Sequence, residues 1–175
     1  MKKIRETGLD FIVDVLSNSI ENVVTGDSFA TDVLLIESAD LKIITKKDGW
    51  LFDWKAEYRL PDRDVYKLII SGNPTIIQGL TSLTERKDHV YMHLIESAPF
   101  NLGRNKVYLG VPGNLVAFAC KISFHRGFEG YVSFTAKTQL IKHYEKMLGA
   151  INVGGHLMVI NTDAALRLID KYFNK

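Results

Sequence analysis

Residues 110–149 constrain the fold of this chain most, because two helical patterns and a strand pattern follow one another there between glycines. Apolar residues after the first glycines fall at the i, i+3, i+4 and i+7 positions of one helix face: Leu115, Phe118, Ala119 and Ile122. Gly127 ends this helix, and residues 129–135, rich in Tyr, Val, Phe and Thr, predict a strand. A second helix face follows at Leu140, Ile141, Tyr144, Met147 and Leu148, before Gly149. A helix that opens from a glycine turn presents free N–H groups and a positive dipole end, which predicts an anion site at its start.

The stretch before residue 110 predicts strands. Residues 65–70, 75–85 and 89–96 are separated by turn signals, which predicts three consecutive antiparallel strands. Trp50, Phe52 and Trp54 alternate with other residues, as in a half-covered strand. A meander followed by helix, strand and helix predicts an α+β fold, with a mixed, largely antiparallel central sheet flanked by helices.

The remaining segments carry weaker patterns. Residues 9–16 fit either a strand, because Phe11, Val13 and Val15 alternate, or a helix. For the others we expect a buried strand or short helix at 32–37, one or two helical turns at 40–47, a strand at 150–160 interrupted by two glycines, and a closing helix capped by Asn161 and Thr162.

Length, charge and cysteine content exclude a few classes of function and leave most of them open. With 175 residues the chain is long enough for one domain with a sizeable core, and we expect residues 1–175 to form a single domain. A net charge of +2 without a Lys/Arg stripe argues against a nucleic-acid partner. A single cysteine excludes an internal disulfide, which favours the cytoplasm. The apolar run at the start is too short for a signal peptide, and none is long enough for a membrane span.

The glycine turn, helix, strand and a helix carrying HYEKMLGA (residues 143–150) together resemble the C-terminal half of the GNAT acetyltransferase superfamily. Members carry a similar "fYeklGF" ending at that place. The resemblance covers residues 65–160 and leaves residues 1–48 as a divergent N-terminal portion. It implies a GNAT-like acyl-CoA N-acyltransferase fold, with acetyl-CoA as co-substrate and no metal.

The resemblance also implies where acetyl-CoA lies. Strands 89–96 and 129–135 would splay apart, the pantetheine arm would lie between them like an added strand, and the pyrophosphate would sit at the start of the following helix. The cofactor-binding residues would then be Leu94, Ile95, Gly110, Val111, Gly113, Asn114 and Leu115. Gly110 and Gly113 would let the backbone approach the phosphates, and Asn114 would be the first helical donor.

Two catalytic residues follow from the same resemblance. Tyr144 matches the family tyrosine that protonates the departing thiolate, although the same ring could simply pack on the apolar helix face. Glu96 lies near the end of a splayed strand and is the candidate base, or else a salt-bridged strand end. His93 is a rival base. Strand alternation puts His93 and Glu96 on opposite faces unless a bulge lies between them.

We therefore expect an N-acetyltransferase that moves an acetyl group to an amine by direct attack in a ternary complex, since no placed nucleophile is evident. The acceptor would be a small-molecule or protein amine, and a homodimer is compatible with the resemblance. The alternative is a catalytically inactive GNAT-like module that binds acyl-CoA or a protein. The spacing of Gly110 and Gly113 departs from the family pattern, and no asparagine follows Ala136, which keeps this alternative open.

Overall fold

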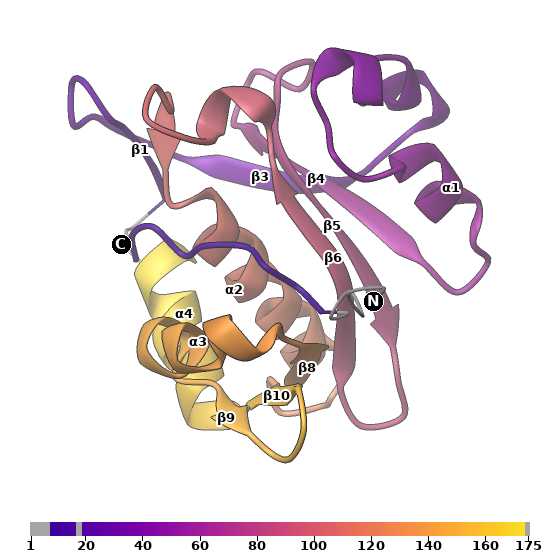
Figure 1. The fold of residues 1–175 in the computed structure, drawn as a ribbon, viewed down its shortest axis with the longest axis vertical. Helices are drawn as coiled ribbons and strands as arrows, with labels where there is room; N and C mark the ends of the chain where they lie inside the picture. The colour runs from indigo at the N-terminus through magenta and orange to yellow at the C-terminus, as the bar shows by residue number, and fades with distance from the viewer. Residues whose placement is uncertain (1–7, 17–18, 174–175) are drawn as a thin grey trace, which may run out of the picture.

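The computed structural model describes residues 8–16 and 19–173, so the start of the chain, where we expect no signal peptide, lies partly outside these ranges. A seven-stranded sheet in the order β3-β4-β5-β6-β8-β10-β9 forms the centre (Figure 1). Its strands are β3 (Thr31–Leu35), β4 (Asp64–Ile70), β5 (Ile77–Glu85), β6 (Val90–Ser97), β8 (Val132–Thr135), β9 (Ile151–Asn152) and β10 (Leu157–Ile160). A small sheet, β2-β1-β7, consists of β1 (Ile20–Asn22), β2 (Ser28–Phe29) and β7 (Tyr108–Leu109).

The predicted meander is confirmed. β4, β5 and β6 pair antiparallel in succession, and β3 adds an edge strand beside β4. Among the named strands of the described residues only β6 and β8 pair in parallel, so the sheet is mixed and largely antiparallel, as predicted for an α+β fold. The segment at 32–37 is a strand, but not a buried one, because its edge position leaves Leu34 and Leu35 exposed.

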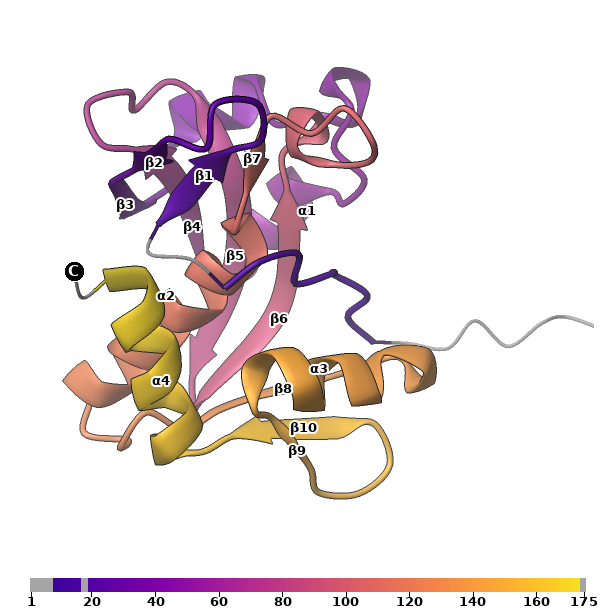
Figure 2. The same cartoon turned by 90° about the vertical axis from the view of Figure 1, so that its left-hand side faces the viewer.

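The predicted helices are present. They are α2 (Val111–His125), α3 (Ile141–Leu148) and α4 (Thr162–Phe173). Gly149 ends α3 in the left-handed conformation, with φ of 66°, and the Asn161 side chain accepts the N–H of Ala164 at the start of α4. α2 packs on β5, β6 and α4, and its buried face joins the largest apolar core. Figure 2 shows α4 beside α2, with α3 lying over β8 and β10.

The predicted strand through Trp50, Phe52 and Trp54 is wrong. Helix α1 (Trp54–Arg59) begins there, because the Asp53 carboxylate accepts the N–H of Ala56 at 3.0 Å and caps it. Trp50 and Trp54 are both buried in a second apolar core on the α1 side of the sheet. The spacing of the aromatic residues therefore results from burial of the two indoles, and it does not indicate a strand.

Short elements complete the chain. The helical turns expected at 40–47 are two 3-10 turns, η1 (Ser38–Lys42) and η2 (Lys46–Asp48). Further 3-10 turns are η3 (Pro99–Asn101) and η4 (Thr138–Leu140). The single interrupted strand expected at 150–160 is instead a hairpin, since β9 pairs antiparallel with β10 across the turn that contains Gly154 and Gly155.

Candidate functional site

β6 and β8 part after a short parallel contact. Their register pairs Val90 with Val132 and Tyr91 with Ser133 only. Beyond this point the carbonyl oxygen of Thr135 accepts the N–H of Leu9 at 2.7 Å, a residue from the start of the described chain. The splay expected between these strands is therefore present, and part of it is filled by the chain itself.

The segment that fills it comprises residues 9–16, which we call the strap. The strap is extended, and its Leu9, Phe11 and Val13 side chains are buried while Ile12 is 54% exposed, as in a strand with one covered face. Leu9 forms an isolated parallel bridge with Ala136 of the chain that continues from β8. Figures 1 and 2 show the strap passing over α2 and α3 beside β6. The sequence left a strand and a helix open for this segment; it is extended, and its pairing partner lies more than 100 residues away along the chain.

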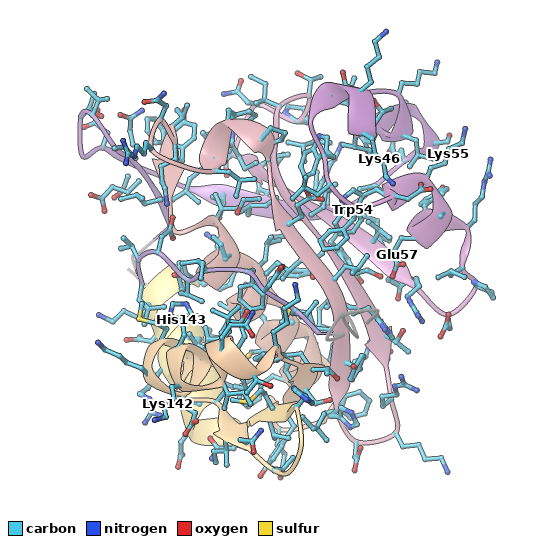
Figure 3. The ribbon with its side chains drawn as sticks, viewed as in Figure 1. Lys46, Trp54, Lys55, Glu57, Lys142 and His143 are labelled. Carbon is cyan, nitrogen blue, oxygen red and sulfur yellow. The ribbon has the colours of Figure 1, made fainter. Side chains whose placement is uncertain are left out.

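Tyr144 lies beneath the strap and is fully buried. Its hydroxyl donates to the carbonyl oxygens of Phe11 at 2.7 Å and Leu9 at 3.3 Å, and its ring stacks on Phe11 with 4.7 Å between centroids. Burial raises the pKa of this phenol well above its usual range. The neighbouring His143, labelled in Figure 3, accepts the N–H of Val13 at its Nε2 atom. Tyr144 thus faces the splay, and its hydroxyl proton is hydrogen-bonded to carbonyl oxygens of the strap.

The start of α2 has the predicted glycine turn. Gly110 caps the helix with φ of 87°, a conformation that favours glycine. An anion already lies there, because Oδ1 of Asp14 in the strap accepts the N–H of Gly110 at 3.0 Å. Nζ of Lys106 is 3.6 Å from the other oxygen of Asp14. A carboxylate therefore occupies the position at which a helix start binds negative charge.

The helix begins earlier than its apolar pattern indicates, and this changes the surroundings of the predicted phosphate residues. Because α2 starts at Val111, the N–H of Asn114 already bonds to the carbonyl of Gly110 at 3.0 Å, and its side chain bonds to Thr31. Val111 and Leu115 are buried and point at Gly79 of β5.

Gly113 has a packing reason to be glycine. A Cβ at this position would lie 1.8 Å from the hydroxyl oxygen of Tyr172 on α4. The absence of a side chain here therefore lets α2 and α4 approach closely. Its role at a phosphate, like that of the other residues predicted to bind cofactor, stays a prediction.

β6 has a bulge on the other side of the splay. Its pairing with β5 shifts between Ser82–Leu94 and Leu83–Met92, which leaves His93 without an opposite residue. Met92 and Ile95 consequently share the face of the main core, while Glu96 bonds to Trp54 on the α1 side. A bulge between His93 and Glu96 was the condition for the two side chains to lie on the same face of the sheet, and this bulge is present.

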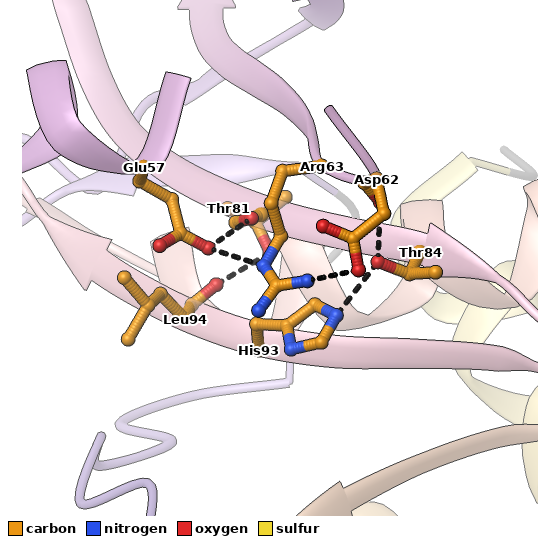
Figure 4. Close-up of polar contacts among 8 residues, drawn as sticks. Glu57, Asp62, Arg63, Thr81, Thr84, His93 and Leu94 are labelled. Atoms are coloured by element: carbon orange, nitrogen blue, oxygen red, sulfur yellow. Dashed lines mark hydrogen bonds and ion pairs between the residues drawn. The ribbon is translucent and has the colours of Figure 1, made fainter. Parts of the chain in front are cut away.

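His93 belongs to a polar cluster on that face (Figure 4). Its Nε2 atom is 2.7 Å from the hydroxyl of Thr84, and Arg63 bridges the carboxylates of Glu57 and Asp62. Burial, reinforced by the positive charge of Arg63, lowers the pKa of His93 to about 4. His93 is therefore neutral at physiological pH and can accept a proton only weakly.

Glu96 is buried and holds a loop. Its carboxylate accepts the N–H of Leu51 at 2.7 Å, the N–H of Phe52 at 3.3 Å and the indole N–H of Trp54 at 2.8 Å. Figure 3 shows Trp54 between α1 and the sheet. This carboxylate therefore anchors residues 51–54 against the end of β6, and its predicted role as a base stays a prediction.

Two hollows remain between the strap and β6. The smaller, about 290 Å³, is lined by strap and β6 residues that include Leu9, His93 and Leu94. The larger, about 500 Å³, is lined by Ile95 and Glu96, by Asp14 of the strap, by Pro112 at the start of α2, and by residues of the 101–106 loop. Leu94 and Ile95, both predicted to contact cofactor, thus border the splay.

Other candidate chemistry finds less support. Cys120 is fully buried in α2, and burial raises the pKa of its thiol. Within residues 8–16 and 19–173 there is no group of three or more His, Cys, Asp or Glu side chains able to hold a metal ion. None of the helices in the described part of the chain is long and apolar enough to span a membrane.

No protein-family model and no curated protein matches the sequence. Solved structures match the fold. The crystal structure of AtaTR bound with AcCoA aligns with a TM-score of 0.56 at 14% identity, over 80% of this chain and 98% of that chain. The chain has the fold of the GNAT acetyltransferases.

Two further matches agree with this GNAT fold. A Vibrio cholerae spermidine N-acetyltransferase SpeG chimera with hSSAT aligns at a TM-score of 0.52 and 16% identity, over 78% of this chain and 98% of that chain. The KacTA–DNA complex aligns at 0.51 and 17%, over 86% of this chain and 97% of that chain. At these identities the likeness concerns the fold.

Sequence reasoning missed the strap and its carboxylate. The alternation of Phe11, Val13 and Val15 was the available signal for an extended segment. Nothing local to residues 9–16 indicates a partner at Gly110 or Tyr144, because those contacts form only when the GNAT fold brings the distant segments together.

Proposed function

We propose that this chain is an acetyl-CoA-dependent N-acetyltransferase that moves an acetyl group to an amine by direct attack. The observation that carries the proposal is the splay of β6 and β8 beside the start of α2, where a carboxylate accepts the N–H of Gly110. A site that binds one anion through a helix N-terminus and a nearby lysine suits another anion such as a phosphate. In the similar AtaTR structure the bound molecule is AcCoA.

The reaction would form a C–N bond and break a C–S bond. The acceptor ammonium must lose one proton before it attacks and a second one as the amide forms, while the departing thiolate gains one, so the site needs a proton acceptor and a proton donor. Tyr144 faces the splay and is the proposed donor. On the opposite wall Glu96 is the proposed acceptor, acting directly or through water, and His93 is its rival because the bulge brings it to the same face.

A second candidate function is a binding module without catalysis. It is favoured by the engagement of both proposed catalytic groups, since Glu96 accepts three N–H groups and the Tyr144 hydroxyl donates to the strap. In that case the GNAT fold would serve to hold acyl-CoA or a protein segment in the splay.

The test measures CoA thiol release from acetyl-CoA with a panel of amines that includes spermidine, together with acetyl-CoA binding by calorimetry. We compare the wild type with Tyr144→Phe and Tyr172→Phe. Tyr172 is a matched control because its hydroxyl also donates to a strap carbonyl, that of Val15 at 2.6 Å. We expect Tyr144→Phe to lower kcat by about 100-fold, within the range for loss of a general acid, and Tyr172→Phe to change it by less than about 3-fold.

The outcomes separate the candidates. Acetyl-CoA binding without thiol release for any amine would favour the binding module. Equal rates in Tyr144→Phe and wild type would remove Tyr144 as the donor. Absence of acetyl-CoA binding at millimolar concentration, in the wild type and in variants with a weakened strap, would overturn both.

A further inference from the structure

We propose that the strap is a built-in competitor of acyl-CoA, so that acyl-CoA binds only after residues 9–16 have left the splay. This inference rests on the proposed function, because it assumes that the splay is where acyl-CoA binds. The strap occupies each position that an extended chain ending in a phosphate would need there.

The first position is the strand edge of β8. The N–H of Leu9 donates to Thr135 and the carbonyl of Leu9 accepts the N–H of Lys137, at 2.7 and 3.2 Å. A ligand that adds to a sheet edge recognises it through these same backbone groups. While the strap holds them, another extended amide chain cannot use them.

The second position is the start of α2. Asp14 places its carboxylate on the N–H of Gly110 and near Nζ of Lys106. A phosphate at this helix start would meet both an occupied donor and the negative charge of Asp14. The strap therefore opposes a phosphorylated ligand by occupying the donor and by repulsion between like charges.

The third position is the floor of the splay at Tyr144. The phenol donates to the strap carbonyls, and the ring of Phe11 covers the ring of Tyr144. A thioester sulfur cannot reach this hydroxyl while Phe11 lies over it. Binding of acyl-CoA and exposure of the proposed proton donor thus require the same movement.

The strap can leave without dismantling the central sheet. Among the described residues, the strap pairs with the segment that continues β8 at the isolated bridge of Leu9 alone, and none of the ladders of the seven-stranded sheet includes a strap residue. On its outer side Ile12 is exposed, and Asp10 contacts Lys137 in an exposed ion pair. Release therefore exposes Leu9, Phe11 and Val13 but keeps the strand order of the fold.

The experiment compares Asp14→Asn with Asp10→Asn in the full chain. Both changes remove one carboxylate from the strap, but only Asp14 lies at the start of α2. Acetyl-CoA is titrated by calorimetry, and amide hydrogen exchange is followed with and without acetyl-CoA. We expect Asp14→Asn to tighten binding by about tenfold, and Asp10→Asn to change it by less than about twofold. We also expect acetyl-CoA to speed exchange in residues 9–16 and to slow it in residues 110–115.

Hydrogen exchange distinguishes competition from simple charge repulsion. If Asp14→Asn tightens binding but exchange in residues 9–16 stays unchanged at saturation, the strap remains in place and the competitor proposal is overturned. If acetyl-CoA binds equally to all three proteins with unchanged strap exchange, the competitor proposal fails while the proposed function stands. If none of the three binds acetyl-CoA, both fail together.

Discussion

The two walls of the splay hold a backbone segment in opposite ways. On the β8 wall, the hydroxyl of Tyr144 donates to strap carbonyls, beneath a stack of aromatic rings. On the β6 wall, the carboxylate of Glu96 accepts N–H groups of residues 51–54. The β8 wall therefore holds its segment through a hydroxyl that donates hydrogen bonds, and the β6 wall holds its segment through a buried carboxylate that accepts them.

This difference determines how costly each contact is to remove. The carbonyl oxygens that Tyr144 contacts are buried while the strap is in place, but the strap has an exposed outer side, so these oxygens reach water once the strap moves away. The N–H groups held by Glu96 include the buried indole N–H of Trp54, which would lose its acceptor if Glu96 were removed. The β8 wall is thus suited to opening, whereas the β6 wall is a fixed part of the fold.

The largest expected effect is at Glu96. Glu96→Ala leaves three N–H donors without their acceptor, and we expect it to lower the free energy of unfolding by about 3 kcal/mol. Urea unfolding followed by tryptophan fluorescence measures this. Glu145→Ala, on the exposed side of α3, is the control and should stay within about 0.5 kcal/mol. A loss below about 1 kcal/mol at Glu96 would contradict the view that the β6 wall is fixed.

The next effect is pH-dependent and also concerns the β6 wall. Burial and Arg63 lower the pKa of His93 to about 4, below its ordinary value of 6.5. As pH falls below 6.5, His93 takes up a proton in the unfolded chain but stays neutral in the folded chain. The free energy of unfolding therefore falls progressively until pH reaches about 4. We expect the wild type to lose about 2 kcal/mol more than His93→Gln between pH 7 and pH 4, measured by urea unfolding at each pH. Parallel pH profiles for the two proteins would show that His93 keeps its ordinary pKa.

A smaller effect is expected on the β8 wall. Tyr144→Phe removes the hydroxyl that donates to Phe11 but keeps the ring stack, and we expect a loss of about 1 kcal/mol in the free energy of unfolding. Amide exchange in residues 9–16 should become faster. A loss as large as that of Glu96→Ala would remove the proposed difference between the walls.

The smallest effect is expected at the outer side of the strap. Nζ of Lys137 lies 2.7 Å from the Asp10 carboxylate, which is half exposed. Lys137→Met should change the free energy of unfolding by less than about 0.5 kcal/mol, with no dependence on added salt beyond that of the wild type. A larger, salt-sensitive change would mean that charge, and not apolar burial, holds the strap to the β8 wall.

The sequence predicted those elements whose signals are local. The apolar spacing of α2 and α3, the left-handed Gly149 and the Asn161 cap all act within a few residues, and each is present in the structure. The strand predicted at Trp50 to Trp54 is not present. Asp53 caps a helix that starts at Trp54, and both indoles are buried without the alternation of a strand.

The candidate site was less accessible to prediction. The resemblance led to Tyr144, Glu96 and the Gly110 turn, and all border the splay. In the structure, these groups form hydrogen bonds with the strap and with residues 51–54. No local sequence pattern indicates that these distant segments contact them. The packing of Gly113 against Tyr172 was likewise invisible, because it depends on how closely two distant helices approach.

The contact between Tyr172 and Val15 has a consequence for how the chain is made. The two residues are 157 positions apart, and the groups of β8 and α3 that hold the strap also belong to the last third of the sequence, whereas Gly110 and Lys106, which hold Asp14, come earlier. Translation proceeds from the N-terminus at about 5–20 residues per second, so the strap leaves the ribosome many seconds before its binding surface exists. During that interval Phe11 and Val13 have no native place to bury. The strap is therefore synthesised well before most of the groups that it contacts, and it is among the last segments able to reach its final position.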